Sequence, residues 1–207
     1  PSRSDISVRL NTMHSQIKYC GEMVRSAMDV LREESRPATA FLLNDVVSSC
    51  LEIARPTLQS NRIKVEKTLS DDLHSIIGDP TLLRQAVLNL LTNACFAMSQ
   101  QVGERMLGVS TWKDGDKQFL SVEDTGPGVP DEFKERVFET FFTTKGSKGT
   151  GLGLAVVMNV VRRHNGKVLL TDRPQGGAVF TLQLPIPSQE EVSLAFRQTH
   201  GGMEGPA

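Results

Sequence analysis

Apolar residues near the amino terminus recur at alternating intervals of three and four positions, the heptad spacing of a coiled-coil seam. The stripe consists of Leu10, Met13, Ile17, Cys20, Val24, Ala27 and Leu31. This pattern predicts a helix within residues 1–36 that needs a partner helix, because a single helix cannot bury the stripe alone. Pro37 ends the pattern, since the residue before a proline disfavours the helical conformation.

After Pro37 the spacing of apolar residues switches between the helical period and the two-residue period of strands. Helical spacing predicts helices at residues 42–58, 80–102 and 152–164, with a short one near 131–138. Alternation predicts strands at residues 62–69, 73–77, 106–113, 117–124, 168–171 and 178–184. Asp79 and Pro80 are typical of a helix start, and Asp114-Gly115 is typical of a hairpin turn.

The order of these elements predicts an α+β fold, a two-layer sandwich in which helices lie on one face of a mixed sheet. The chain then divides into a coiled-coil-like helix at residues 1–36, an α+β domain at 37–187 and a polar tail at 188–207. Within the tail, Ser188 and Glu191 predict a short capped helix.

Composition narrows the classes of function. The 207 residues carry a formal net charge of −1, which argues against a nucleic-acid partner. Because there is no run of about 20 apolar residues and no signal peptide, we expect no membrane segment in this chain. Cys20, Cys50 and Cys95 form no metal or redox motif, so we expect reduced, buried thiols in a cytosolic setting. The chain begins within a helical pattern, and we expect it to be a fragment of something longer.

Two asparagines, Asn89 and Asn93, lie four positions apart on the predicted helix at 80–102 and therefore share one face. Their amide oxygens suit a hard cation such as Mg²⁺, which takes few protein ligands besides phosphate oxygens. The alternative is a solvated helix face or a helix-to-loop hydrogen bond, neither of which needs a ligand. Taken alone, the pair favours this alternative.

Asp124 ends a predicted strand and is followed by Thr-Gly-Pro-Gly. A carboxylate in this position can accept a hydrogen bond from an exocyclic amine, while Gly126 and Gly128 leave room for a flat ring. The alternative is an ordinary turn, because Asp, Gly and Pro are the usual turn residues.

The stretch FFTTKGSKGTGLGLAVV, residues 141–157, gathers lysines and glycines immediately before a predicted helix. Exposed N–H groups at a helix start attract anions, and glycine allows close approach of the backbone, so this stretch can cradle phosphate. It matches neither the dinucleotide fingerprint nor the P-loop. An ordinary flexible loop is the alternative.

Four motifs occur in one order: NLLTNA, DTGPGVP, FETFFTTK and GTGLGLAVV. On these motifs, residues 41–185 resemble the catalytic and ATP-binding domain of sensor histidine kinases, within the wider group that includes the Hsp90, gyrase B and MutL ATPases. The resemblance implies that Asn93 holds Mg²⁺ between the ATP phosphates, assisted by Asn89. It implies that Asp124 binds the adenine amino group, with Gly126 and Gly128 shaping that pocket.

The same resemblance implies roles for the segment that follows. Phe138 and Phe142 match the aromatic positions of the family's F-box, and residues 143–148 match a mobile lid. Lys145 would reach the phosphates, while the glycines would let the lid fold and present the N–H groups of the next helix. The ATP-binding residues implied here are Thr144, Lys145, Gly149, Thr150, Gly151, Leu152, Gly153 and, near an adenine-bound water, Thr181.

One departure from the wider group bears on the reaction. Gyrase-type ATPases have a glutamate one helical turn before the metal-binding asparagine, and this chain has Asn89 there. Because an amide cannot take a proton from water, we expect phosphoryl transfer to a protein rather than hydrolysis, with Asn89, Asn93 and Lys145 as the catalytic residues. A Ser/Thr kinase of the same fold and a non-catalytic nucleotide-binding scaffold remain alternatives.

The helix at residues 1–36 resembles the second helix of the family's dimerisation hairpin, which implies a homodimer and a response regulator as partners. The family's acceptor-histidine motif is missing, so we expect the acceptor on a first helix outside this chain, with His14 as a minor candidate. His74, His164 and His200 are expected at the surface. We expect the module to act in the cytoplasm, whether or not the longer protein is anchored in a membrane.

Overall fold

The computed structural model describes residues 38–99, 101–146 and 149–200, with side chains as far as Ala195. The predicted seam helix, His14 and Cys20 lie outside these residues, as do positions 147 and 148 of the predicted lid and the side chain of His200.

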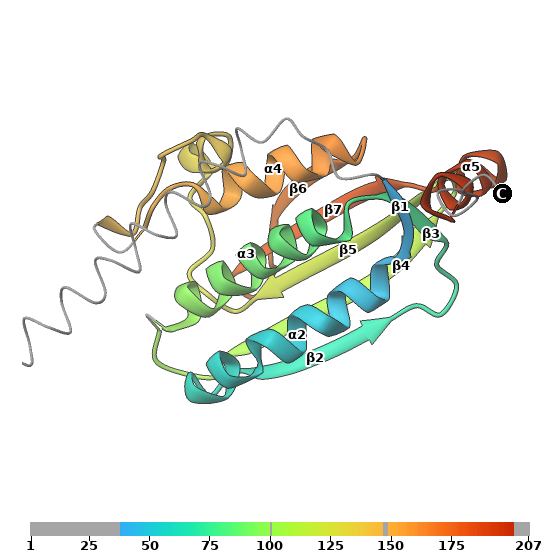
Figure 1. The fold of residues 1–207 in the computed structure, drawn as a ribbon. Coiled ribbons are helices and arrows are strands. Elements are labelled where there is room, and N and C mark those ends of the chain that lie inside the picture. Colours follow the sequence, from blue (N-terminus) through green and yellow to red (C-terminus); the bar gives the residue numbers. More distant parts are fainter. Residues whose placement is uncertain (1–37, 100, 147–148, 201–207) are drawn as a thin grey trace, which may run out of the picture.

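A five-stranded mixed sheet forms one layer of the domain, and three helices cover one of its faces (Figure 1). The strands are β2 (Lys64–Leu69), β4 (Met106–Asp114), β5 (Lys117–Asp124), β7 (Ala178–Pro185) and β6 (Lys167–Asp172), in this spatial order. The covering helices are α2 (Leu43–Ser60), α3 (Pro80–Ser99) and α4 (Gly153–Arg163). Only the β2–β4 pair is parallel among these strands, and the chain between them crosses over through α3, as parallel neighbours require.

A second, two-stranded antiparallel sheet lies at one end of the domain. It pairs β1 (Thr39–Leu42) with β3 (Ser75–Gly78), and α5 (Gln189–His200) packs against both strands (Figure 1). Two 3-10 turns, η1 (Asp131–Phe133) and η2 (Arg136–Phe138), belong to the long connection between β5 and α4.

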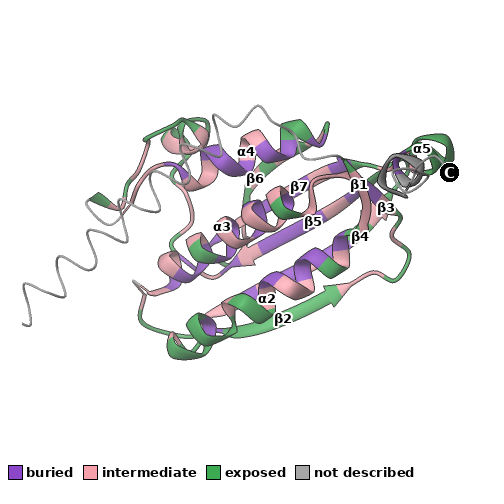
Figure 2. Ribbon diagram, in the orientation of Figure 1, coloured by how far each residue is buried: buried purple, intermediate pink, exposed green. Residues whose placement is uncertain are grey.

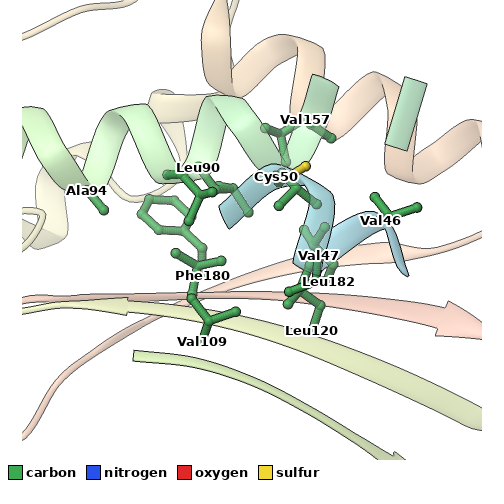
Figure 3. Packing of buried hydrophobic residues seen from close by; sticks show 14 of the residues in the cluster. Val46, Val47, Cys50, Leu90, Ala94, Val109, Leu120, Val157, Phe180 and Leu182 are labelled. Atoms are coloured by element: carbon green, nitrogen blue, oxygen red, sulfur yellow. The ribbon is translucent and has the colours of Figure 1, made fainter. Parts of the chain in front are cut away.

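The hydrophobic core lies between the helices and the five-stranded sheet (Figure 2). Alternation directs every second strand residue to this core, and Figure 3 shows Leu120, Phe180 and Leu182 pointing toward Val47 of α2 and Leu90 of α3. Large apolar side chains at these positions give the sheet one buried face. The other face carries polar residues with a stacked pair, Trp112 and Phe119.

The predicted α+β sandwich is confirmed, and the predicted helices and strands of the domain occur with small shifts at their ends. Asp79 caps α3 as expected, because its Oδ1 accepts from the N–H groups of Thr81 at 2.8 Å and Leu82 at 3.4 Å. In the tail, the Ser188 hydroxyl and Glu191 carboxylate form the predicted capping contacts at the start of α5.

Three expectations differ from the structure. The strand predicted at 73–77 does not join the main sheet, because it pairs with β1, a strand that the apolar pattern did not indicate. The short helix predicted near 131–138 is the pair of 3-10 turns, η1 and η2. His164 is buried rather than at the surface, with 5% of its area exposed, because it closes the core where α4 ends beside Gly78. His74 is exposed, as predicted.

The two described cysteines, Cys50 and Cys95, are free and buried, as expected. Burial raises the pKa of the Cys50 thiol to about 11, despite the nearby Arg84 guanidinium, and it also raises the pKa of Cys95. Both are therefore core residues whose thiols stay protonated at neutral pH.

Candidate nucleotide-binding site

Asp124 is a buried carboxylate at the end of β5, with 3% of its area exposed. One oxygen accepts from the backbone N–H of Gly126 at 2.8 Å. Burial raises the pKa of Asp124, and the nearby backbone N–H groups of Gly126 and Ala178 oppose that shift. Because a carboxylate has about four acceptor positions, this one keeps capacity for a further donor such as an amine.

The loop after Asp124 packs closely against α3. An ideal Cβ placed on Gly126 would lie 2.6 Å from Asp124 Oδ1 and 2.8 Å from the Cβ of Ala97. A side chain at this position would therefore separate the loop from both Asp124 and the helix. Gly128 lies further along the loop, against the backbone of Gly177. These contacts hold the loop close to the Asp124 carboxylate and to α3.

Asn89 and Asn93 lie half-buried on one face of α3. Asn89 Nδ2 donates to the carbonyl oxygen of Gly153 at 3.2 Å, so its amide joins α3 to the first residue of α4. Asn93 Oδ1 accepts from Lys145 Nζ at 2.6 Å, and this ammonium also lies 4.5 Å from the centre of the Phe96 ring. Burial lowers the pKa of Lys145.

Asn89, Asn93 and Ala97 follow one another at intervals of four residues along α3. Asn89 contacts the start of α4, Asn93 contacts Lys145, and Ala97 lies against the loop at Gly126. We call these three residues the α3 strip. It joins the carboxylate at Asp124 to the glycine-rich segment before α4, two regions that are far apart in the sequence.

The glycine-rich segment makes a tight turn at Gly151, whose φ of +67° lies in the left-handed region. An ideal Cβ at Gly151 would lie 2.3 Å from the carbonyl carbon of Phe141, while the Gly151 carbonyl accepts from the Phe141 N–H at 2.9 Å. Thr150 Oγ1 accepts from the N–H of Leu152 at 3.2 Å, and the Leu152 side chain is buried. Only a glycine at position 151 allows its backbone to lie this close to the backbone of Phe141.

The remaining predicted residues of this segment surround that turn. Gly149 N–H donates to the Gly146 carbonyl at 3.3 Å, and Thr144 is exposed. Phe138 meets the edge of Phe180 in the core, at 6.4 Å between ring centres. Phe142 lies 5.5 Å from Phe133 and 4.5 Å from the Arg136 guanidinium. Phe138 therefore packs onto the core, and Phe142 packs against side chains of the two 3-10 turns.

Thr181 does not come together with the other candidates. Residues of β7 alternate between the two faces of the sheet, and Thr181 pairs with Ser121 on the face away from the helices. Asp124 faces the helices, so Thr181 lies on the opposite side of the sheet. The β7 residue whose backbone N–H lies near the Asp124 carboxylate is Ala178, which no motif in the sequence indicates. Its place on the buried face follows by counting back in steps of two from Phe180.

The comparisons with known proteins agree with this geometry. Residues 78–188, over half of the chain, match the family described as "Histidine kinase-, DNA gyrase B-, and HSP90-like ATPase". The chain belongs to this family, as a catalytic ATP-binding module of the two-component sensor histidine kinase type.

Relatives of known name support the same class. Sensor histidine kinase ZraS of Salmonella typhi is 32% identical over 180 residues, which cover 86% of this chain and 38% of that protein. Signal transduction histidine-protein kinase AtoS of Escherichia coli K12 is 32% identical over 181 residues, covering 87% of this chain and 29% of AtoS. This chain therefore spans only about a third of the length of these relatives.

Solved structures share the fold. The catalytic domain of histidine kinase ThkA, in a nucleotide-free form, superposes with a TM-score of 0.65 and 29% identity, over 73% of this chain and 97% of that domain. ThkA in complex with response regulator protein TrrA gives a TM-score of 0.75 at 23% identity, over 90% of this chain and 53% of that chain. This second likeness supports the fold alone.

The described residues contain no group of three or more His, Cys, Asp or Glu side chains arranged to hold a metal ion. A cation at this site would therefore depend on the amide oxygen of Asn93 and on oxygens of the ligand itself. Among the same residues, no helix combines the length and the apolar character needed to span a bilayer.

Proposed function

We propose that this module binds ATP together with Mg²⁺ and transfers the γ-phosphoryl group to a histidine on a dimerisation hairpin, for relay to a response regulator. The observation that carries the proposal is the α3 strip, which connects the buried Asp124 carboxylate with the turn before α4. A carboxylate at one end and an amide with a lysine at the other match the two ends of a nucleoside triphosphate.

Each end of the site has a distinct task. The Asp124 carboxylate accepts a hydrogen bond from the adenine amino group, and the glycines beside it admit the ring. Asn93 would hold Mg²⁺ through its side-chain oxygen, and Lys145 would bind the phosphates. When bound, Mg²⁺ supplies charge neutralisation at the phosphates. Backbone N–H groups at the start of α4 add anion-binding capacity at the same end.

The residue one helical turn before Asn93 favours transfer over hydrolysis. Asn89 is an amide that donates to the Gly153 carbonyl. Because it cannot accept a proton, it cannot activate a water molecule as a general base. The preferred acceptor is then a nucleophile from another protein segment, and a histidine hairpin fits the relatives named sensor histidine kinases.

The partners follow from the same class. We infer a homodimer that supplies the hairpin from the same or the partner subunit, and a response regulator as the next acceptor. Because ATP and such regulators are cytoplasmic, we place the site of action in the cytoplasm.

Phosphorylation in trans tests the proposal. The chain is incubated with Mg²⁺, ATP labelled on the γ-phosphate, and the separately produced histidine hairpin of the same kinase. We expect a labelled hairpin whose phosphate is lost in acid and retained in alkali, and no label when Asn93→Ala replaces the wild-type chain. An acid-stable label would indicate a Ser/Thr kinase instead, and free phosphate without labelled protein would indicate an ATPase.

A further inference from the structure

We propose that Gly177 is a positioning residue for Asp124, so that the turn between β6 and β7 controls recognition of the adenine amino group. The inference rests on the proposed function, which assigns that amino group to Asp124. Gly177 lies at the end of this turn, directly before β7, and its φ of +115° is in the left-handed region.

The backbone of Gly177 lies directly against the backbone of Asp124. An ideal Cβ on Gly177 would be 1.9 Å from the carbonyl oxygen of Asp124, 2.9 Å from its carbonyl carbon and 3.2 Å from Thr125 Cα. No side chain can occupy a space this small, and the obstructing atoms are main-chain atoms that cannot rotate away. Only glycine allows this distance between the turn and the end of β5.

The loop after Asp124 orients its side chain. The backbone N–H of Gly126 donates to Asp124 Oδ1 at 2.8 Å. The Gly177 contact therefore places the main chain of Asp124, and the Gly126 hydrogen bond sets the direction of its carboxylate. The remaining acceptor positions keep a fixed direction for the ligand.

The turn is itself held in place. The N–H of Arg173 donates to the Gly177 carbonyl at 3.2 Å, and Gly176 N–H donates to the Arg173 carbonyl at 3.0 Å. The Arg173 guanidinium also pairs with Glu123, the residue before Asp124, and the Arg173 side chain is only 15% exposed. The ion pair and the glycine contact thus attach the turn to β5 on both sides of the same peptide unit.

A matched pair of substitutions separates positioning from backbone strain. Gly176 has φ of +90°, also left-handed, but no atom of the described residues lies within 4 Å of an ideal Cβ there. Gly176→Ala therefore introduces similar backbone strain without pressing on Asp124. Gly177→Ala introduces the strain and also presses on the main chain of Asp124 and Thr125.

The experiment measures how much the adenine amino group contributes to binding. Calorimetry gives the dissociation constants of the full chain for ATP and for purine riboside triphosphate, which lacks only that amino group. We expect wild type to prefer ATP by about tenfold or more, as for a hydrogen bond to a charged group. Gly177→Ala should bring this ratio close to one, whereas Gly176→Ala should keep it. A general loss of stability would weaken both ligands equally and leave the ratio unchanged.

Asp124→Asn separates failure of the inference from failure of the proposed function. If Asp124→Asn loses the preference and Gly177→Ala keeps it, the inference is overturned and the proposed function stands. A wild-type ratio near one would overturn the inference together with the assignment of the adenine amino group to Asp124. Should thermal melting show that Gly177→Ala does not fold, Arg173→Met releases the turn without a new side chain at Gly177. This variant must then lower the ratio, and an unchanged ratio would overturn the inference.

Discussion

At the scale of single residues, His164 shows how a polar side chain can serve the core. Its ring lies beside Gly78, where an ideal Cβ would be 2.3 Å from the ring, and it meets Phe41 edge-on at 6.4 Å. Nδ1 pairs with the Val160 carbonyl at 2.8 Å, and burial lowers the pKa of the ring although Asp79 opposes this and Arg163 adds to it. The folded protein therefore holds His164 neutral.

This burial predicts that the domain loses stability in mild acid. The unfolded chain takes up a proton at a pH near 6.5, and the folded one does so only at lower pH, so the free energy of unfolding falls as pH drops below about 6.5. One such group contributes at most about 1.4 kcal/mol per pH unit. Urea unfolding at several pH values between 7.5 and 5 gives the free energy of unfolding at each pH. The slope of this free energy against pH should be smaller for His164→Asn than for wild type. Equal slopes would mean that His164 does not cause the acid sensitivity.

At the scale of elements, α3 serves both the core and the site. One side of it packs Leu83, Val87, Leu90, Leu91 and Met98 against the sheet and its neighbours, while the α3 strip faces the loops. Lys145, in the segment before α4, donates from Nζ to Asn93 Oδ1 at 2.6 Å. The same face of the helix therefore orders the residues that we propose to meet the phosphates. A helix can carry both tasks because residues four apart share a face.

The strip predicts that Asn93→Ala removes the effect of Mg²⁺ on ATP binding. We expect ATP affinity in the presence of Mg²⁺ to fall about tenfold or more, the scale of a lost interaction with a charged group. Affinity without Mg²⁺ should change little. Thr92→Ala is the matched control, because Thr92 is exposed and its hydroxyl bonds only within α3, to the Leu88 carbonyl at 2.8 Å. Calorimetry that finds both variants equal would contradict a role for Asn93 at the cation.

At the scale of the whole molecule, local patterns predicted the elements but not all of their partners. The alternation in β4, β5 and β7 and the cap at Asp79 are local signals, and the structure agrees with them. The separate pairing of β1 with β3 depends on contacts between residues 39 and 78, which no short window of sequence contains. The burial of His164 beside Gly78 is a long-range contact of the same kind.

The candidate site likewise combines residues that a local sequence pattern indicates with contacts between residues far apart in the sequence. Motifs in one order indicated Asn89, Asn93 and Asp124, whose places in the structure follow from the register of α3 and β5. The contact of Gly177 with Asp124 and the ion pair of Arg173 with Glu123 join residues about 50 positions apart in sequence. Thr181 lies on the other face of the sheet from Asp124, because the residues of β7 alternate between the two faces.

The measurement that addresses the proposed function most directly is ATP binding to the whole chain, with and without Mg²⁺, by calorimetry. We expect Mg²⁺-dependent binding with a dissociation constant between micromolar and millimolar, about −8 to −4 kcal/mol. Binding of this kind would establish Asp124 and the α3 strip as a working nucleotide site. A chain that is folded by circular dichroism and yet binds no ATP under either condition would contradict the proposal and leave the fold as a scaffold.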